Sequence, residues 1–487
     1  MGDFMLKDIN KIEEKIKKDY GNSSDLVFRK LKVKNYNILY VYLESVSSDD
    51  KVSEFLVKSL EKHNKPIFEN IFDSLKNSIY NSHLYVENKM SDIYTKLASG
   101  FTIIFIDKFN KAISVETRMT LDRGVSESTS ENVIRGPKDS FTENHAINKG
   151  LIRKRIKTNK LWFKDITVGR KTKTMVSVAY IEDVADTRRV KKIINKIKKI
   201  DIDGILDSGY IRDFLYSKKA TVFPKVKSSE RPDLASAALL EGKIIIMVEN
   251  SPFVLITPSV LVDFFHTSED YYQKAQNVNF TRILRFIAFI LTIITPAFYV
   301  AVTTFNQEMI PNELLISLAI QQDGVPFPTA FEVVMMMVTF EILRECDIRI
   351  PNPMGAAVSI VGALVLGEAA VSAGIVSPIV IIVVAITSIC GLLFSDIDFV
   401  NALRIWRFIF LGFATIAGMI GIVMGIICLI IKLSDVESDN VAYLDPLSPL
   451  HFSAFNDAIV RTSLNKIKKR PIYSAYKNQT KVGDYDE

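Results

Sequence analysis

Three long stretches without a charged residue constrain this chain more than any other feature of its sequence. They are Phe286–Gln307, Ala369–Ser395 and Phe408–Ile431, which are 22, 27 and 24 residues long. A helix of about 20 apolar residues crosses the roughly 30 Å hydrocarbon core of a bilayer. The lipid interior also requires backbone polar groups to pair within the spanning element. The sequence therefore predicts an integral membrane protein with at least three helical spans.

The whole apolar region divides into five candidate spans. They are Leu284–Thr303, Val325–Leu343, Met354–Ala373, Ile375–Phe394 and Phe408–Ile431. Basic residues favour cytoplasmic ends, and they occur at Arg282, Arg285, Arg344, Arg349, Arg404, Arg407 and again in the tail at Lys466–Arg470. Five complete spans would put that tail outside. We therefore expect both termini inside and an even number of crossings, with one irregular segment or a contribution from Ile310–Ile320.

The region before the first span has the pattern of a folded, charged and soluble part. Short apolar runs alternate with helical patterns, which favours an α/β or α+β fold. We predict cytoplasmic subdomains at residues 1–200 and 201–280, a helical multi-pass membrane domain at 281–433 and a polar tail at 434–487. Predicted strands include Ile38–Leu43, the pair Phe101–Asp107 and Ala112–Glu116, Val176–Ile181, and the pair Lys243–Val248 and Phe253–Ile256. Predicted helices include Val52–Leu60, Ile67–Ile79, Asn144–Ile156, Arg188–Ile200 and Leu234–Glu241.

Composition and motifs exclude several functional classes. The net charge of +6 is spread over 61 basic and 55 acidic residues, which suits an anionic membrane surface but gives little support for nucleic-acid binding. All three cysteines lie in or beside the apolar region, so no disulfide framework is expected. The five histidines are dispersed, and no phosphate-binding loop, dinucleotide fingerprint or zinc motif occurs. We predict neither an enzyme nor a cofactor or metal site.

Polar residues in the soluble part have a structural and a functional interpretation. Ser229 is a plausible N-cap, and Arg231, Pro232 and Asp233 suit a capped helix start. The same three residues are alternatively candidates for coupling to the membrane domain or to a neighbouring subunit. Arg135 lies in a predicted turn, and Asp270 lies just before the first span. Both are further coupling candidates.

Inside the membrane region, a stripe of small residues is the main candidate feature. Small residues let helix backbones approach closely in lipid. In Met354–Ala373 they recur at intervals of four at Gly355, Ser359, Ala363 and Gly367, with Gly362 beside them. One interpretation is tight packing within a subunit, and the other is the lining of a subunit interface or narrow pore.

Two intramembrane carboxylates are candidates for an ion pathway or a gate. Charged groups in lipid are costly and usually face protein or water. Glu332 has no basic partner nearby in sequence, and Glu368 adjoins Gly367. The alternative for both is a hydrogen-bonded contact between helices. Glu341 can pair with Arg344 or Arg349 at the inner boundary.

Several separated motifs resemble the A-subunit family of bacterial spore germinant receptors, the GerA type. The soluble part contains RGPKDSFTEN (135–144), LIRKRI (151–156), ERPDLASAALLEGKIIIMVENSPFVLITP (230–258) and SEDYY (268–272). The membrane part contains PAFYVAV, PFPTAFE, EILRECDIRIP, VSIVGALVLGEAAVSAGIVSP and RIWRF within residues 296–408. The order and spacing are similar to those of the family over most of residues 100–433.

The resemblance implies a receptor subunit in the spore inner membrane, with its N-terminal region on the core side. It also implies a permease-like B subunit and a lipoprotein C subunit as partners. Self-association into an oligomeric, ligand-gated ion channel is implied as well. Two other functions stay open on the sequence alone. These are a secondary transporter that uses the same carboxylates, and a non-conducting scaffold of a release complex.

Overall fold

The computed structural model describes residues 6–483 except 34–35, 58–70, 80, 82, 121–129, 217–220, 350–364, 449–456, 459, 464–466, 472 and 476. The chain divides into two compact units. The first comprises Met1–Lys219, Val226–Ser259 and Leu464–Glu487, and the second comprises Ala220–Lys225 and Val260–Ser463.

The first unit contains an antiparallel five-stranded sheet in the order β1-β2-β4-β5-β3. Helices α1 and α5 pack on one face through alternate residues of β2 and β4, and the other face packs against η1 and α4. Burial on both faces explains why β4 is apolar at nearly every position. The elements are α1 (Ile9–Asp19), β1 (Leu26–Val33), β2 (Tyr36–Leu43), α2 (Asp49–Lys51), η1 (Val52–Val57), α4 (Ile71–Ser78), β3 (Leu84–Glu87), α5 (Met90–Ala98), β4 (Phe101–Ile106) and β5 (Ala112–Glu116).

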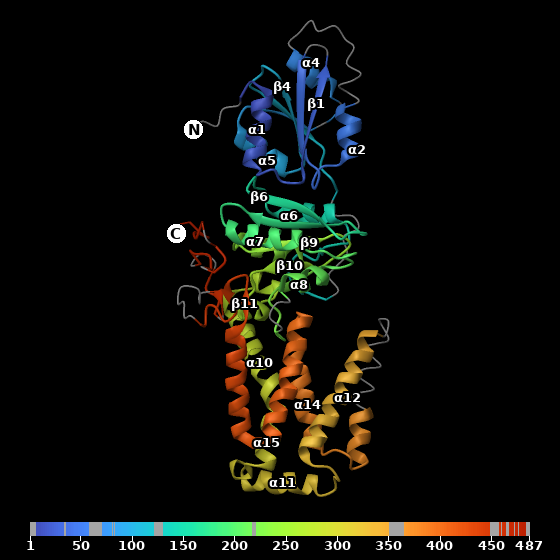
Figure 1. Ribbon diagram of the computed structural model, residues 1–487, viewed down its shortest axis with the longest axis vertical. Coiled ribbons are helices and arrows are strands. Elements are labelled where there is room, and N and C mark those ends of the chain that lie inside the picture. Colours follow the sequence, from blue (N-terminus) through green and yellow to red (C-terminus); the bar gives the residue numbers. More distant parts are fainter. Residues whose placement is uncertain are drawn as a thin grey trace. The chain divides into compact units, whose positions relative to one another are not determined.

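A second antiparallel sheet in the same unit has the order β6-β7-β9-β10-β8. Helices α7 and α8 cover one face, where Ile193, Ile197 and Ile211 pack on Val178 and Ile246. Helices α6 and α9 contact each other and the sheet (Figure 1). The elements are α6 (His145–Arg155), β6 (Leu161–Val168), β7 (Thr174–Ile181), α7 (Thr187–Lys198), α8 (Ser208–Tyr216), β8 (Lys227–Ser229), α9 (Pro232–Leu240), β9 (Ile244–Val248) and β10 (Val254–Thr257).

The sequence signals that predicted the two ends of helix α9 are correct except for the N-cap residue. Pro232 occupies the first helical turn, and Gly242 follows the helix with φ +90°, as expected for its two ends. The N-cap is Arg231 rather than the predicted Ser229. Ser229 instead belongs to β8, and its hydroxyl accepts a hydrogen bond from the Arg231 backbone N–H at 3.1 Å.

The C-terminal segment of the chain belongs to the first unit. The Ser474 hydroxyl donates to the Glu241 carbonyl at 2.6 Å, and the Arg470 Nε donates to the Leu240 carbonyl at 2.7 Å. Ala475 forms an isolated antiparallel bridge with Ala185. A Cβ on Gly242 would lie 2.9 Å from the Ser474 carbonyl oxygen, so this contact needs glycine at that position. The end of the chain is therefore fixed to the same fold as its beginning.

The second unit is a bundle of helices. Helices α10, α12, α14 and the two arms of α15 run alongside one another, and α11 lies across one end (Figure 1). Residues 365–372 are also helical. The elements are η2 (Leu261–Phe265), η3 (Ser268–Tyr271), α10 (Ala275–Thr304), η4 (Gln307–Met309), α11 (Asn312–Gln322), α12 (Thr329–Arg349), α14 (Pro378–Gly391), α15 (Ile397–Asp435), β11 (Glu437–Ser438) and β12 (Val441–Ala442).

Helix α15 is a helical hairpin rather than one straight span. Gly418 lies inside it with φ +57° and ψ −133°, which are not helical values. The two arms meet side by side, because a Cβ on Gly425 would lie 3.1 Å from the Phe410 ring and one on Gly421 would clash with the Phe413 carbonyl. The prediction of one span over Phe408–Ile431 is therefore wrong. Each arm has about 17–21 residues, or roughly 25–30 Å at 1.5 Å per residue.

An aromatic cluster forms the core of the helical unit at one end. Phe399 packs against Phe264, with ring centroids 5.1 Å apart, and against Phe265 at 5.8 Å. Phe223 and Tyr443 complete the cluster. Segments before α10 and after α15 therefore fold with the helices as one body.

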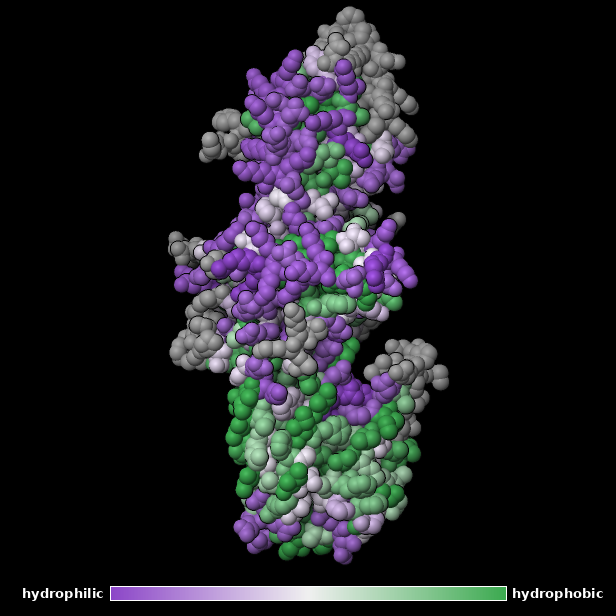
Figure 2. Space-filling view, viewed as in Figure 1, coloured by the Kyte–Doolittle hydropathy of each residue, from purple (hydrophilic) through white to green (hydrophobic). Residues whose placement is uncertain are grey.

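The face of the helical unit seen in Figure 2 is largely apolar between its two ends. Exposed side chains include Ile382, Ile386, Ile389, Ile416, Ile420 and Ile427. Helix α10 has the length and composition to cross a membrane, and the α15 segment is similarly apolar, with mean hydropathies of 2.2 and 2.6 over their most apolar windows. Apolar side chains that a water-soluble unit would bury are here suited to contact lipid. The chain is a membrane protein.

Candidate functional site

A carboxylate shared by two arginines lies immediately before the first membrane helix. Asp270 belongs to η3 and accepts hydrogen bonds from Arg282 Nε at 3.2 Å and Arg285 Nη1 at 3.0 Å. Arg282 and Arg285 project from the first turns of α10. All three side chains are largely buried. Arg285 Nη1 also donates to the Phe265 carbonyl at 2.7 Å, so the group orders the entire approach to the helix.

The C-terminal part of the second unit joins this group. Arg461 Nη1 donates to the Asp270 carbonyl, and its backbone N–H donates to the Asn279 side chain at 2.6 Å. Arg282 Nη1 donates to the Asp457 carbonyl at 2.9 Å. We call Asp270, Arg282, Arg285 and Arg461 the juxtamembrane clamp. It links the segment before α10, the start of α10 and the segment after α15, so these three move as one body while the clamp is intact.

The clamp gives a structural role to the two arginines that flank the first span. The sequence indicated only that they lie at a cytoplasmic boundary, whereas both arginines are internal partners of Asp270. Removing one member of a buried ion pair leaves an uncompensated charge and typically costs about 3–5 kcal/mol. If η3 were displaced, α10 would therefore move with it, because breaking these ion pairs would cost more free energy.

The other predicted coupling residues lie in the first unit. Arg231 is buried and donates to Asp233 Oδ2 at 2.8 Å and to the Pro137 carbonyl at 2.7 Å. Pro232 is the first residue of α9, so Arg231, Pro232 and Asp233 lie together at one helix start. Arg135 is exposed in the same loop as Pro137. Arg231 therefore holds this loop against α9.

The membrane candidates have different environments. Glu332 is 1% exposed in the first turn of α12, and its Oε2 accepts a hydrogen bond from the Ser377 backbone N–H, the N-cap of α14, at 2.8 Å. Gly367 is buried and faces the Ile381 side chain, whereas Glu368 is exposed on the surface of this single chain. The remaining stripe residues, Gly355, Ser359, Gly362 and Ala363, lie outside the described residues.

Glu341 pairs with different arginines from those expected. Its carboxylate contacts Arg404 and Arg407 of α15, the latter at 2.5 Å. Sequence proximity suggested Arg344 or Arg349, because they follow Glu341 on the same helix. The bundle instead brings α15 beside α12, and this contact depends on tertiary structure.

Two polar networks in the first unit were not predicted as functional. Arg153 Nε and Nη2 bind Asp25 at 2.7 and 2.9 Å, which joins helix α6 of the second sheet to the loop before β1 of the first sheet. His145 Nε2 lies 2.7 Å from the Ser177 hydroxyl, which in turn contacts Asp165. Burial, together with the nearby Lys149 ammonium, lowers the pKa of His145 to about 4 against the opposing effect of the Asp165 and Glu249 carboxylates.

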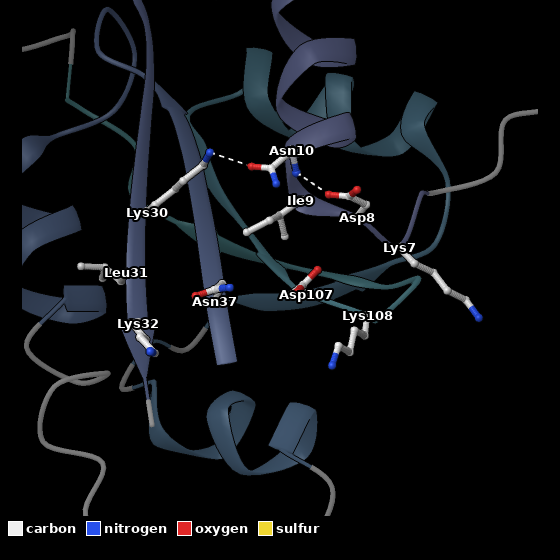
Figure 3. A pocket seen from close by; sticks show the side chains of 10 residues that line it. All are labelled: Lys7, Asp8, Ile9, Asn10, Lys30, Leu31, Lys32, Asn37, Asp107 and Lys108. Carbon is white, nitrogen blue, oxygen red and sulfur yellow. Dashed lines mark hydrogen bonds between the residues drawn. The ribbon is translucent and has the colours of Figure 1, made fainter. Parts of the chain in front are cut away.

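A surface hollow of about 730 Å³ lies beside the start of α1 (Figure 3). Lys30 donates to Asn10 at 2.9 Å, and Asp8 caps α1 through the Asn10 backbone N–H. The ammonium groups of Lys7, Lys32 and Lys108 do not converge on a common point (Figure 3). The hollow therefore gives no indication of a specific ligand.

Taken together, the two sheets, the helical bundle and the clamp define a membrane protein with a large folded extramembrane part. Comparison with known proteins then identifies its family. The family model for the Bacillus/Clostridium GerA spore germination protein matches residues 14–473. This chain belongs to the GerA spore germination protein family, whose members are germinant-receptor A subunits and not enzymes.

Individual relatives agree with this assignment. The chain is 36% identical over 462 residues to spore germination protein KA of Bacillus subtilis, covering 93% of this chain and 84% of that one. It is 32% identical over 475 residues to spore germination protein GerLA of Bacillus cereus, covering 96% of each. The crystal structure of the N-terminal domain of the A subunit of the Bacillus megaterium germinant receptor GerK3 is 30% identical, covers 53% of this chain and 97% of that one, and superposes with a TM-score of 0.43.

Proposed function

We propose that this A subunit forms an oligomeric pore in the spore inner membrane and releases monovalent cations when a nutrient is sensed. Its partners would be a permease-like B subunit, which receives the nutrient, and a lipoprotein C subunit. The observation that carries the proposal is a carboxylate, Glu332, buried among membrane helices and bound to a helix N-terminus. A carboxylate is costly to place in lipid, and those found within a membrane usually mark a pathway for ions, protons or substrates.

The two ends of the chain support an even number of crossings. Arg470 and Ser474 contact the α9 region of the first unit, which supports a placement of the N- and C-terminal parts in one compartment. Six crossings satisfy this condition, by α10, α12, the span predicted from the sequence at Met354–Ala373, α14 and the two arms of α15. Flanking arginines favour the cytoplasmic, core-facing side for that compartment.

The juxtamembrane clamp supplies a route for coupling. In this proposal the folded extramembrane part responds to the partner subunit, and Asp270 passes the displacement to α10 through Arg282 and Arg285. The pore would open as α10 shifts against its neighbours. The stripe at Gly355, Ser359, Gly362, Ala363 and Gly367, with Glu368, would line the subunit interface.

The test is cation flux from liposomes that contain the assembled receptor. We expect germinant-dependent efflux that Glu332→Gln reduces and that a bulky substitution at Gly362 blocks, with Glu313→Gln on exposed α11 as the matched control. Saturable uptake coupled to an ion gradient would instead indicate a transporter. Normal assembly without any conductance would indicate a scaffold and would overturn the proposal.

A further inference from the structure

Three arginines and one glutamate meet where α12 contacts the first arm of α15. Glu341 of α12 accepts hydrogen bonds from Arg404 and from Arg407 Nη2, the latter at 2.5 Å. Arg344 follows about one turn later on α12 and is close enough to both of these arginines to repel them. Arg404 Nη1 also donates to Asn401 Oδ1 at 2.9 Å. We call Arg344, Arg404 and Arg407 the arginine cluster.

The arginine cluster carries more positive charge than its carboxylate balances. Glu341 supplies one negative charge, and its two oxygens are already bound to Arg404 and Arg407. Among the described residues the half-buried Arg344 guanidinium forms no ion pair and no hydrogen bond. The other carboxylate near Arg344 is that of Glu345, which is exposed. Like charges held this close together favour the binding of an anion.

A second, independent observation is a buried donor without an acceptor. Arg407 is 4% exposed, and its Nε has no hydrogen-bond partner within the part of the chain that the structure describes. The Phe408 ring centroid lies 5.8 Å from the guanidinium carbon, but a ring offers no oxygen acceptor. Buried donors are nearly always paired, and arginine donors bind most strongly to the oxygens of an anion. The geometry therefore calls for an oxyanion beside Arg407.

The arginine cluster lies at the edge of the apolar surface. Ile342 and Ile405, which adjoin Glu341 and Arg404 in the sequence, are 59% and 48% exposed. The apolar face of the helical unit gives way to hydrophilic surface at the end where α12 terminates (Figure 2). Arginines beside lipid-facing apolar side chains are typical of the level of the lipid headgroups. At this level the oxyanion within reach is the phosphate of a phospholipid.

We infer that the arginine cluster binds the phosphate group of an anionic phospholipid. A guanidinium presents its N–H groups as a planar fork that matches two phosphate oxygens, and basic pockets between transmembrane helices bind anionic headgroups. Arg344 and the Nε of Arg407 would hold the phosphate, while Glu341 keeps Arg404 in place. A headgroup without net charge would leave the excess positive charge unbalanced, so the site should prefer phosphatidylglycerol to phosphatidylcholine. This inference is independent of the proposed pore.

Native mass spectrometry of the full-length protein in detergent tests the site, because it counts bound lipid directly. The protein is titrated with phosphatidylglycerol, with phosphatidylcholine of the same acyl chains, or with inorganic phosphate. We expect phosphatidylglycerol to be retained at concentrations at which phosphatidylcholine is not. Arg344→Gln should need at least about fivefold more phosphatidylglycerol for half-saturation. Lys432→Gln, which alters an exposed basic residue on the second arm of α15, is the matched control and should keep the parent affinity.

Two variants separate binding from folding. Arg344→Gln leaves both ion pairs of Glu341 in place, so the variant should fold. Arg407→Lys keeps a charge for Glu341 but removes the Nε donor, so it should also weaken retention, and it decides alone if Arg344→Gln does not fold. Equal retention of the two lipids, or an unchanged affinity in these variants, would overturn the site. Half-saturation by inorganic phosphate at the same concentrations would overturn the assignment to lipid and indicate a soluble anion.

Discussion

Arg153→Met is the substitution with the clearest expected effect on the extramembrane fold. Arg153 is fully buried, and its guanidinium binds both oxygens of Asp25, which is 2% exposed. The methionine side chain keeps most of the apolar stem but removes every donor. Asp25 would then keep its charge with only the Ser23 and Ser45 hydroxyls as partners, at 2.7 Å each.

The magnitude follows from the pKa of Asp25. Burial alone would raise this pKa, but the Arg153 guanidinium and the hydroxyls of Ser23 and Ser45 lower it to about 2. Against a normal value of about 3.9, the shift corresponds to roughly 2–3 kcal/mol of stability at neutral pH. Because the folded pKa is the lower one, this contribution is present above pH ~4 and is lost as the pH falls through about 2. Without Arg153 the burial penalty is uncompensated, and the loss should reach about 3–5 kcal/mol.

Hydrogen–deuterium exchange on the full-length protein in nanodiscs measures this loss at the amides of β1, β6 and α6. Arg153→Met should reduce their protection by that amount, and adding Asp25→Asn should restore part of it because the isolated charge disappears. Exposed Lys154→Met is the matched control and should change protection by less than about 0.5 kcal/mol. A loss below about 1 kcal/mol in Arg153→Met, unchanged in the double variant, would refute the reasoning.

Three further predictions concern other parts of the molecule. Because burial holds the pKa of His145 near 4, the unfolded state binds a proton below pH ~6.5 that the folded state does not. Stability should therefore fall by about 2 kcal/mol from pH 6.5 to 5, and exchange protection in β7 should lose this pH dependence in His145→Gln. Gly418→Val should sharply lower the yield of folded, monodisperse protein, since its φ is +57° and a Cβ would lie 2.7 Å from Phe305 Cβ; Gly412→Ala, with open space around it, should be harmless. Asp270→Asn should increase exchange at Asn279 and Arg461 and uncouple germinant addition from flux, whereas unchanged exchange would show that the clamp is not needed to hold these segments.

Local signals in the sequence predicted most secondary structure of the first unit. The β4–β5 hairpin was expected because two apolar runs flank a short polar turn, and Lys108 in that turn has φ +71°. Helix α6 begins after Asn144, whose side chain accepts hydrogen bonds from the backbone N–H groups of Ala146 and Ile147. These features depend on residues within one or two turns of each other, so composition and spacing are sufficient to predict them.

Local sequence patterns could not predict ion pairs between residues that are far apart in the chain. Arg153 and Asp25 are 128 residues apart, and neither position differs in local pattern from a solvated charge. The partners of Glu341 were assigned to its own helix for the same reason, whereas the folded bundle supplies Arg404 and Arg407. In the candidate site, the sequence could identify Glu332 as an intramembrane carboxylate but not the helix N-terminus that binds it.

The hairpin at Gly418 shows why apolar length alone does not count spans. Hydropathy is the same whether 24 apolar residues continue in one direction or reverse, and a glycine within a transmembrane pattern is common. The reversal becomes necessary only when the chain ends are considered together, since Ser474 packs on Glu241 of the first unit. If all five spans predicted from the sequence crossed the membrane and α15 were one of them, the two ends would lie on opposite sides and these contacts could not form. In the proposed topology the two arms of α15 make six crossings and bring both ends to the same side, so the backbone reversal at Gly418 is consistent with the docking of the C-terminal segment.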